Sequence, residues 1–273
     1  MILYDGHVHT PFCPHGTKDT IESYIEQALA HGIKGLTFAE HAPLPEGFID
    51  PTPLRDSAMK KEHLYEYIEL IQQYKKDYKD KIDIRVGLEV DYIVGFEKET
   101  TALLNDVGPQ LDDSLLSVHF LRNDDRYYCL DYSPEAFAEM IDVFGSIDGV
   151  YKNYFDTVKQ SITANLGSYK PKRIGHITLV RKFQNKYPAT HDFRANITDI
   201  LDTISTRQLQ LDYNGAGTAK PLCREPYPPA SVVEEAIQRK IPLIYGSDAH
   251  SHKGLLQGKD QLVQHAPLVT PDS

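Results

Sequence analysis

Three histidines lie within nine positions near the start of the chain, in the stretch DGHVHTPFCPHG that runs from Asp5 to Gly16. His7 and His9 are two positions apart, so on a β-strand both side chains would lie on one face. His15 follows after two prolines. Imidazole is a ligand for Zn²⁺, Mn²⁺ and Fe²⁺. A lone histidine is more commonly a hydrogen-bonded core residue, so a metal site requires partners elsewhere in the chain.

Candidate partners stand at the ends of other predicted strands. Apolar or β-branched runs typical of strands occur near residues 1–8, 34–39, 82–90, 114–120, 173–179, 208–213 and 242–247. At or just after the ends of these runs lie His7, His9, Glu40, His41, Glu89, His119, His176, Asn214, Asp248 and His250. Imidazoles together with carboxylates indicate a transition-metal site. Glu89 also follows a run that looks buried, where an unpaired carboxylate would be costly.

Amphipathic, helix-like stretches separate these runs. The first covers residues 20–32, where Thr20 is placed to cap a helix and Gly32 to end it. The other predicted helices cover residues 62–78, 97–107, part of 134–165, 192–206 and 229–239. Seven strand–helix alternations in 273 residues predict an α/β protein with a parallel sheet closed into a barrel, as one domain over residues 1–273. The carboxyl ends of all barrel strands open on one face, where the candidate ligands would meet.

Composition narrows the class of protein. The net charge is −10, and the basic runs are short, which argues against a nucleic-acid partner. No apolar run approaches the ~20 residues of a membrane span, and the sequence MILYDG is unlike a signal peptide. Three cysteines do not form a disulfide framework, so we expect a cytoplasmic protein that acts on small molecules. The proline-rich loop over residues 42–56 is either an active-site flap or a plain surface loop.

Six segments carry a resemblance to a known family. They are DGHVHTPFCPHG, FAEH, GLEVDY, SVHF, GHITLVRKF and YGSDAH, distributed over residues 5–250. In this order they resemble the polymerase-and-histidinol-phosphatase (PHP) family of metallohydrolases, and within it the branch of monofunctional histidinol-phosphatases. The resemblance implies a distorted (β/α)7 TIM-like barrel with three divalent metal ions. Whether these are Zn²⁺, Mn²⁺ or Fe²⁺ is open, as is the oligomeric state.

The resemblance also implies which residues hold the metals. The ligand sets would be His7, His9, Glu89 and Asp248 for one ion, Glu89, His119 and His176 for a second, and His15, His41 and His250 for the third. The chain departs from the family after the sixth strand. It has YNGAG at residues 213–217 where relatives often have an Asn-Thr-Ser-Gly-type sequence. Asn214 matches, while the role of the following loop is in doubt.

The implied activity is hydrolysis of histidinol phosphate to histidinol and inorganic phosphate in histidine biosynthesis. Our hypothesis is that two metals bridged by Glu89 hold a hydroxide that attacks phosphorus. The leaving alkoxide needs a proton, for which Asp248 and Glu40 are candidate donors. Glu40 could instead orient His41 without touching the substrate.

The candidates for substrate binding follow from the charge of the substrate. Phosphate suits a forked cation, so Arg181 and Arg224 are candidates, each with a surface arginine as the alternative. Asn214 is a third candidate. The amino and imidazole groups of histidinol would suit Asp91, with Tyr92 beside it.

Two other functions share parts of this pattern. One is a PHP-family phosphoesterase that acts on nucleotides or other small phosphate esters, which would have the same metal centre. The other is a PHP module that assists a DNA polymerase, and the acidic charge argues against it. A metal-free scaffold would have lost ligands, whereas all nine ligand positions are intact.

Overall fold

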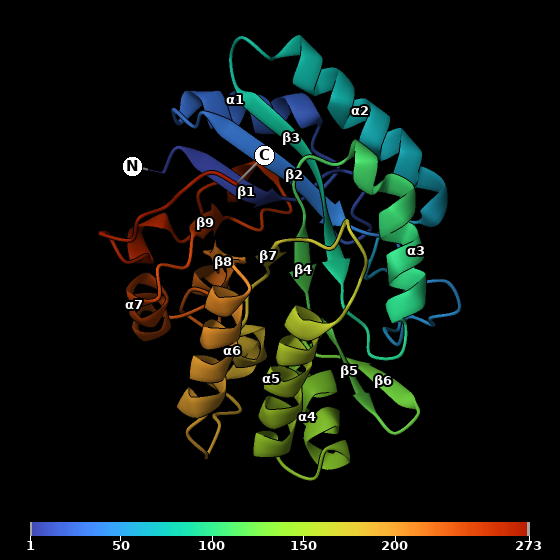
Figure 1. Cartoon of the computed structure of the whole chain (residues 1–273), viewed down its shortest axis with the longest axis vertical. Helices are drawn as coiled ribbons and strands as arrows, with labels where there is room; N and C mark the ends of the chain where they lie inside the picture. The colour runs from blue at the N-terminus through green and yellow to red at the C-terminus, as the bar shows by residue number, and fades with distance from the viewer. Residues whose placement is uncertain (1, 272–273) are drawn as a thin grey trace.

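The computed structural model describes residues 2–271 and shows an α/β barrel (Figure 1). Seven strands form one sheet in the order β1-β2-β3-β4-β7-β8-β9, and each neighbouring pair is parallel. The strands are β1 (Tyr4–Val8), β2 (Gly35–His41), β3 (Asp83–Asp91), β4 (Leu115–Ser117), β7 (Arg173–Ile174), β8 (Gln210–Asn214) and β9 (Leu243–Gly246). The predicted fold class is therefore confirmed.

The first and last strands meet and nearly close the ring. The backbone N–H of Asp248 donates to the carbonyl of His7 at 2.7 Å, and the N–H of His9 donates to the carbonyl of Ala249 at 3.0 Å. Val8 and Ala249 form a parallel bridge between them. This closure brings the first candidate ligands of the chain against the last ones.

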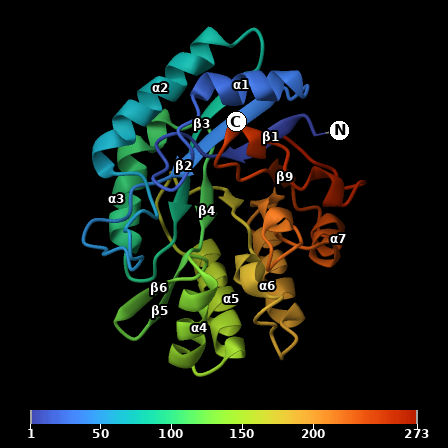
Figure 2. The same ribbon diagram turned by 180° about the vertical axis from the view of Figure 1, so that it is seen from behind.

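The α-helices of the described residues, seven in number, surround the strand ring. Views from the front and from behind both show helices outside the strands (Figures 1 and 2). Within residues 2–271 they are α1 (Ile21–Ala30), α2 (Leu64–Asp77), α3 (Glu97–Val107), α4 (Pro134–Val143), α5 (Ile147–Thr163), α6 (Arg194–Thr206) and α7 (Ala230–Gln238). Helix α1 has the predicted ends, because the Thr20 side chain accepts from the N–H of Ser23 and Gly32 follows with a φ of +74°. None of these helices is both long enough and apolar enough to cross a membrane.

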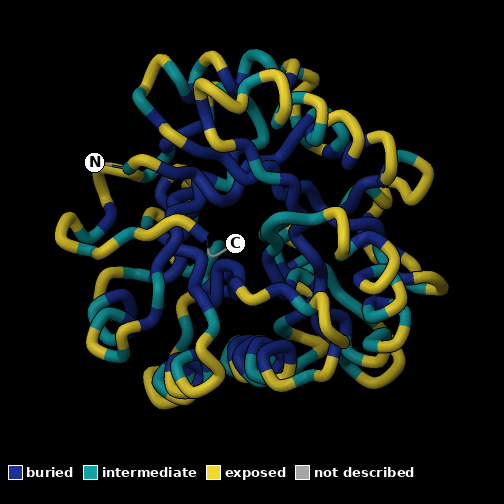
Figure 3. Tube along the Cα trace, turned by 45° about the horizontal axis from the view of Figure 1, so that its top comes forward, coloured by how far each residue is buried: buried dark blue, intermediate teal, exposed yellow. Residues whose placement is uncertain are grey.

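Buried residues line the inner ring of strands, and exposed ones lie on the outer helices and loops (Figure 3). Every residue of β1 and β2 is buried, because parallel strands of a barrel have side chains inside and helices outside. Short 3₁₀ turns occur in the connecting segments, at Lys61–His63, Gly108–Gln110, Leu179–Phe183, Ala216–Ala219, His252–Gly254 and Lys259–Gln261.

Three predicted elements differ from the structure. The run at 114–120 is strand only as far as Ser117, and the chain then forms an unpredicted antiparallel hairpin, β5 (Phe120–Asn123) and β6 (Arg126–Cys129). Its turn contains Asp124 with a φ of 51°, a conformation that aspartate tolerates better than most residues. The run at 173–179 is strand only at its first two residues and ends in a 3₁₀ turn. The helical region within 134–165 is two helices, α4 and α5.

A buried polar network lies at the amino end of the barrel, where the strands begin. Nη2 of Arg173 donates to the carbonyl of Gly6 at 2.8 Å and to the carboxylate of Asp113. The hydroxyl of Thr37 donates to the same carboxylate at 2.8 Å, and the hydroxyls of Thr37 and Tyr4 lie 3.0 Å apart. A Cβ on Gly6 would lie 2.1 Å from Nη1 of Arg173, so this position requires glycine. We call these residues the amino-end network.

Candidate metal centre

The carboxylate of Glu89 is the centre of the ligand cluster. Glu89 stands in β3, with 1% of its side chain exposed. Its Oε2 lies 3.3 Å from Nε2 of His7, 3.5 Å from Nε2 of His9 and 3.1 Å from Nδ1 of His41. Strands β1, β2 and β3 are neighbours in the sheet, which is why these groups meet. His7, His9 and Glu89 form one group whose donor atoms are close enough to hold a metal ion.

The other carboxylate oxygen of Glu89 faces two further histidines. Its Oε1 lies 2.9 Å from Nε2 of His176 and 3.8 Å from Nε2 of His119. These three residues form a second group that could hold a metal ion. Nδ1 of His119 lies 2.8 Å from Oδ1 of Asp91, which orients the ring so that Nε2 faces the centre. Glu89 thus belongs to two groups, as a bridging ligand would.

Carboxylates behind the cluster orient His7 and His9. Nδ1 of His7 lies 3.1 Å from Oδ2 of Asp212, and Nδ1 of His9 lies 3.2 Å from Oε1 of Glu40. Each contact leaves Nε2 directed at the centre, an arrangement common among metal-binding histidines. Glu40 was predicted either to donate a proton or to orient His41. The His41 ring lies against Glu89 instead, and Glu40 contacts only the backbone N–H of His41. Asp212 was not predicted, although LDYN places it two residues before Asn214.

A third set of donors lies on the solvent side of His9. Nε2 of His15 and Nε2 of His250 are 3.1 Å apart. Nδ1 of His15 lies 2.8 Å from the carbonyl of Asp56, and Nδ1 of His250 lies 3.1 Å from the carbonyl of Asp248. Both Nε2 atoms therefore point to one location, at which they could share an ion.

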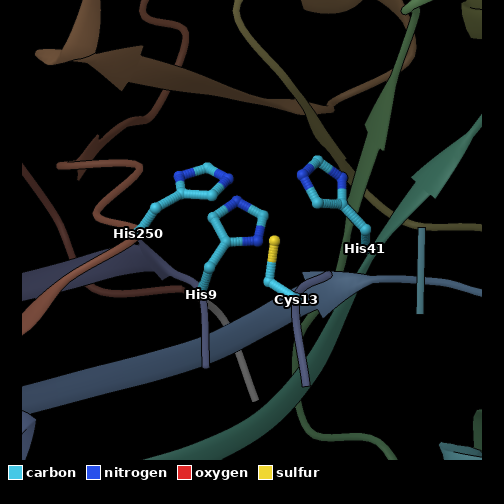
Figure 4. A group of neighbouring side chains, drawn as sticks. All are labelled: His9, Cys13, His41 and His250. Atoms are coloured by element: carbon cyan, nitrogen blue, oxygen red, sulfur yellow. The ribbon is translucent and has the colours of Figure 1, made fainter. Parts of the chain in front are cut away.

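Cys13 belongs to this part of the cluster and was not predicted as a ligand. Its thiol forms a group with His9, His41 and His250 whose donor atoms lie close enough to hold a metal ion, and Figure 4 shows the sulfur beneath the rings of His9 and His41. Burial raises the pKa of the Cys13 thiol. Three widely spaced cysteines indicated only the absence of a disulfide framework, and no spacing in the sequence connects Cys13 with His41 or His250.

The electrostatics of the cluster fit metal ions. Burial by itself would raise the pKa of Glu89 and of Asp248, but facing imidazoles, His7 foremost, hold both values well below the ordinary range. Burial and the neighbouring His9 lower the pKa values of His41 and His250, which leaves neutral imidazoles with lone pairs. Within the described chain, Nε2 of His7 and Nδ1 of His41 are buried without a hydrogen bond. Divalent cations would satisfy these donors.

The cluster forms the floor of a cavity of about 480 Å³. Six predicted metal ligands line it, namely His15, His41, His119, His176, Asp248 and His250. Its wall includes Asp91, Asp131, Tyr132, Lys182, Lys220 and Tyr227. A cavity of this size accommodates a small organic molecule. The centre can therefore be reached by a substrate.

The PHP domain model matches residues 5–216, which is most of the chain. The chain belongs to the PHP family. It is 50% identical to the histidinol-phosphatase of Bacillus subtilis over 248 aligned residues. The alignment covers 90% of this chain and 92% of that protein. It is also similar to the solved structure of a Listeria monocytogenes protein assigned as a histidinol phosphatase, with a TM-score of 0.89, 37% identity and coverage of 94% and 98%.

A more distant structure has the same fold. The histidinol phosphate phosphatase of Lactococcus lactis, solved with zinc, L-histidinol and phosphate, matches with a TM-score of 0.71 at 18% identity and covers 97% of this chain and 94% of that one. The PHP barrel is therefore retained across low sequence identity.

Two of the predicted substrate-binding residues of this PHP protein lie beside predicted metal ligands. Asp91 lines the cavity and contacts His119. Asn214 is fully buried, and its Nδ2 donates to Oδ2 of Asp212 at 3.1 Å and to Oδ2 of Asp248 at 3.2 Å. This position suits a residue that orients the carboxylates of Asp212 and Asp248.

The structure does not bring the two predicted arginines to the cavity. Nε of Arg181 donates to Glu225, and neither Arg181 nor Arg224 is among the lining residues of the described chain. Lys182 lines the cavity instead. Residues 179–183 form a 3₁₀ turn, in which neighbouring side chains point about 120° apart, so only one of the two adjacent cations can face inward.

The loop over residues 42–56 reaches the site at its end. Asp56 and the following Ser57 line the cavity, and the carbonyl of Asp56 contacts His15. Asp50 stabilises the loop from within by accepting from the N–H groups of Thr52 and Ser57. The loop is thus more than a remote surface connection.

Proposed function

We propose that this PHP protein is a phosphoric monoester hydrolase that converts L-histidinol phosphate to L-histidinol and inorganic phosphate, a step of histidine biosynthesis. The observation that carries the reaction type is the cluster of imidazoles around Glu89 at the floor of an open cavity. The substrate follows from the 50% identity to the Bacillus subtilis histidinol-phosphatase along nearly the whole of both chains.

The proposed cofactor is a set of three divalent ions, Zn²⁺, Mn²⁺ or Fe²⁺, with the ligand sets that the family resemblance implies. The ions, when bound, supply a nucleophile from water at neutral pH and positive charge opposite the phosphoryl oxygens. Support for the ligand sets comes from the two groups that share Glu89 and from the paired Nε2 atoms of His15 and His250. We expect His15→Ala to remove about one ion of the three while the His7 and His9 site keeps its own, as metal analysis would show.

The two proposed proton donors have different surroundings. Glu40 is fully buried, and its carboxylate accepts from the backbone N–H and the hydroxyl of Thr10 while contacting His9. It is not among the lining residues of the described chain, which suits a residue that positions His9. Asp248 lines the cavity with 18% of its side chain exposed. Because the Asp248 carboxylate is ionised at rest, we assign to it both halves of a proton transfer: it takes the proton of the attacking nucleophile and passes that proton to the leaving alkoxide.

This assignment is tested with Asp248→Asn and Glu40→Gln. We expect Asp248→Asn to lose turnover even at full metal loading. Glu40→Gln should lose metal affinity first and recover much of its turnover in excess metal. Full metal content with near-full activity in Asp248→Asn would contradict the role of Asp248.

Metal analysis combined with phosphate release tests the proposed activity. The purified protein, reloaded with each metal after chelation, is assayed on L-histidinol phosphate, nucleoside monophosphates and a generic phosphodiester. We expect the highest kcat/KM on L-histidinol phosphate and no release without metal. A preference for nucleotides or for the diester would replace the proposal with the related phosphoesterase function.

The remaining predictions agree with this role. One continuous sheet contains strands from Tyr4 to Gly246, which supports a single domain over residues 1–273. All three cysteines are free within the described chain, as is usual in a reducing compartment, so we propose a cytoplasmic location.

A further inference from the structure

An ion pair on the cavity wall is not used by the metal centre. Nζ of Lys182 donates to Oδ2 of Asp131 at 2.8 Å and to the carbonyl of Asp131 at 2.6 Å. Both residues line the cavity, with 20% and 22% of their side chains exposed. A molecule that reaches the predicted metal ligands can therefore also contact this pair.

The backbone holds Asp131 at a constant position relative to a metal ligand. Asp131 follows the hairpin β5–β6, which begins directly after His119. The N–H of Leu130 donates to the carbonyl of His119 at 2.8 Å. Movement of the carboxylate relative to the His119 ring is thereby restricted.

A buried tyrosine holds the Lys182 segment in the same way. The hydroxyl of Tyr154 donates to the carbonyl of His176 at 3.0 Å and accepts from the N–H of Leu179 at 3.2 Å. Leu179 begins the 3₁₀ turn that contains Lys182. Both members of the pair are thus connected to ligands of the second metal group.

Each member of the pair has capacity for another partner. An ammonium has three protons, and Asp131 takes two protons of Lys182. The second carboxylate oxygen of Asp131, Oδ1, lies 3.5 Å from the Cys129 sulfur, which is only a weak donor. The pair therefore offers one strong donor and one strong acceptor, side by side, close to the metal ligands.

The proposed substrate has charges in a matching arrangement. Its ammonium is on the carbon next to the one that bears the phosphate ester, so a positive and a negative group lie side by side. Two of the other carboxylates that line the cavity already have partners, because Asp91 contacts His119 and Asp248 contacts His9. Asp56 lies beside His15, which belongs to a different predicted ligand set from His119 and His176. Exchanging one ion pair for two leaves no charge unpaired, which avoids the main cost of burying charged groups.

We propose that Asp131 and Lys182 form the specificity site for a vicinal amino phosphate, in which Asp131 binds the ammonium and Lys182 binds a phosphoryl oxygen. This inference rests on the proposed function and names the feature of the substrate that the site recognises. It also assigns to Lys182 the phosphate contact that the sequence suggested for Arg181. Phosphate esters without the neighbouring amine would lose the Asp131 contact and keep the Lys182 contact.

The test compares L-histidinol phosphate with its des-amino analogue, 3-(imidazol-4-yl)propyl phosphate. Asp131→Asn should lower kcat/KM on the amino substrate by about 10- to 100-fold, the range for a lost hydrogen bond between charged groups, with a much smaller loss on the analogue. Lys182→Gln should lower kcat/KM on both substrates by similar factors. A residue that only maintained the fold would not distinguish the two substrates.

Matched controls lie near each residue. Asp125→Asn changes a fully exposed carboxylate at the tip of the same hairpin, and Lys186→Gln changes an exposed lysine one turn beyond Lys182. Both should keep wild-type kcat/KM on both substrates, and metal content should be equal in all variants. The wild-type enzyme supplies a test without any substitution, since 2-aminoethyl phosphate should inhibit more strongly than ethyl phosphate.

Three results would overturn the inference. Equal losses of Asp131→Asn on both substrates, or equal inhibition by the two small phosphates, would remove the ammonium contact while leaving the proposed function standing. Absence of L-histidinol phosphate hydrolysis by the metal-loaded wild-type enzyme would instead overturn the proposed function and this inference together.

Discussion

The two ends of the barrel interior bury charged side chains in different ways. At the amino end, Arg173 is paired with the carboxylate of Asp113, so a protein cation meets a protein anion. At the carboxyl end, Glu89 and Asp248 face imidazoles, whose nitrogens have lone pairs to offer when they are neutral. The first arrangement is complete within the chain, whereas the second would be completed by the proposed metal ions. Buried charged groups therefore indicate a functional site only where carboxylates and imidazole lone pairs outnumber the positive charges that the chain itself supplies.

Solvent access separates the two Asp–cation pairs in the same way. The Arg173–Asp113 pair has 0% and 6% of its side chains exposed, while the Lys182–Asp131 pair lines the cavity at about a fifth exposed. A sealed pair can only hold the fold, because no substrate reaches it. An accessible pair beside the predicted metal ligands can exchange partners with a substrate.

The largest effect is expected for Arg173→Met, which would leave Asp113 buried without its cation. Removing one partner of a buried pair costs about 3–5 kcal/mol, so the free energy of unfolding should fall by this amount in urea denaturation. The metal content of the folded fraction should not change. Arg194→Met, at an exposed position, is the control with a change below about 0.5 kcal/mol. If Arg173→Met lost bound metal but kept its free energy of unfolding, the amino end of the barrel would have a functional role and not a structural one.

Glu89→Gln should have the opposite outcome. Substituting a residue behind a metal ligand costs about 10- to 100-fold, so the shared ligand itself should cost more than about 100-fold in kcat/KM, with loss of bound metal. The free energy of unfolding measured in chelator should change less than in Arg173→Met. Elemental analysis and phosphate release measure the effect, and Glu135→Gln on the surface is the control. Retention of all metal by Glu89→Gln would contradict the central position of this carboxylate.

A smaller effect is expected for Asp212→Asn, which acts through His7. A neutral amide holds the Nδ1 proton of His7 less strongly than a carboxylate does, so Nε2 becomes a weaker ligand. Metal affinity should fall by about 10- to 100-fold, and excess metal should restore most of the turnover. A loss of turnover that metal does not restore would show that Asp212 has a different role.

The smallest effect concerns Asp19, whose partly exposed carboxylate connects the loops of His15 and His250 through Thr17 and His252. Hydrogen bonds from Thr17 and then His252 lower the pKa of Asp19 to about 2, from 3.8 in the unfolded chain. Its contribution to stability is therefore complete above pH 4 and is lost as pH falls toward 2. Solvent screening limits it to below about 1 kcal/mol.

Melting temperatures of the wild type and Asp19→Asn at pH 6, 4 and 3 measure this contribution. The difference between the two proteins should be largest at pH 6 and should shrink at pH 3. A difference that does not depend on pH would show that the charge of Asp19 is not the cause.

Much of the fold and of the candidate site was predictable from local patterns. The alternation of apolar runs and amphipathic stretches indicated the parallel barrel, because each pattern has its own period. The position of Glu89 near the end of such a run then placed it at the carboxyl face. The elements that were predicted wrongly also depend on local features. Strand β4 ends early, at Ser117, and the chain then forms the hairpin over residues 120–129.

Contacts between distant segments were beyond the reach of these patterns. Asp212 lies 205 residues from His7, and Cys13 lies far from His250 along the chain, so no spacing rule connects either pair. The choice of Lys182 over Arg181 depends on the phase of a 3₁₀ turn, which a shift of one residue would reverse.

The sequence by itself determined which residue types are available as metal ligands and that they lie at the ends of strands, because strand period and burial are properties of short segments. Only the tertiary structure decided which nitrogen of each histidine faces Glu89 and which cation faces the cavity. The physical reason is that hydrogen bonds and ion pairs act over a few ångströms, and those distances exist only after the seven strands have closed into a ring.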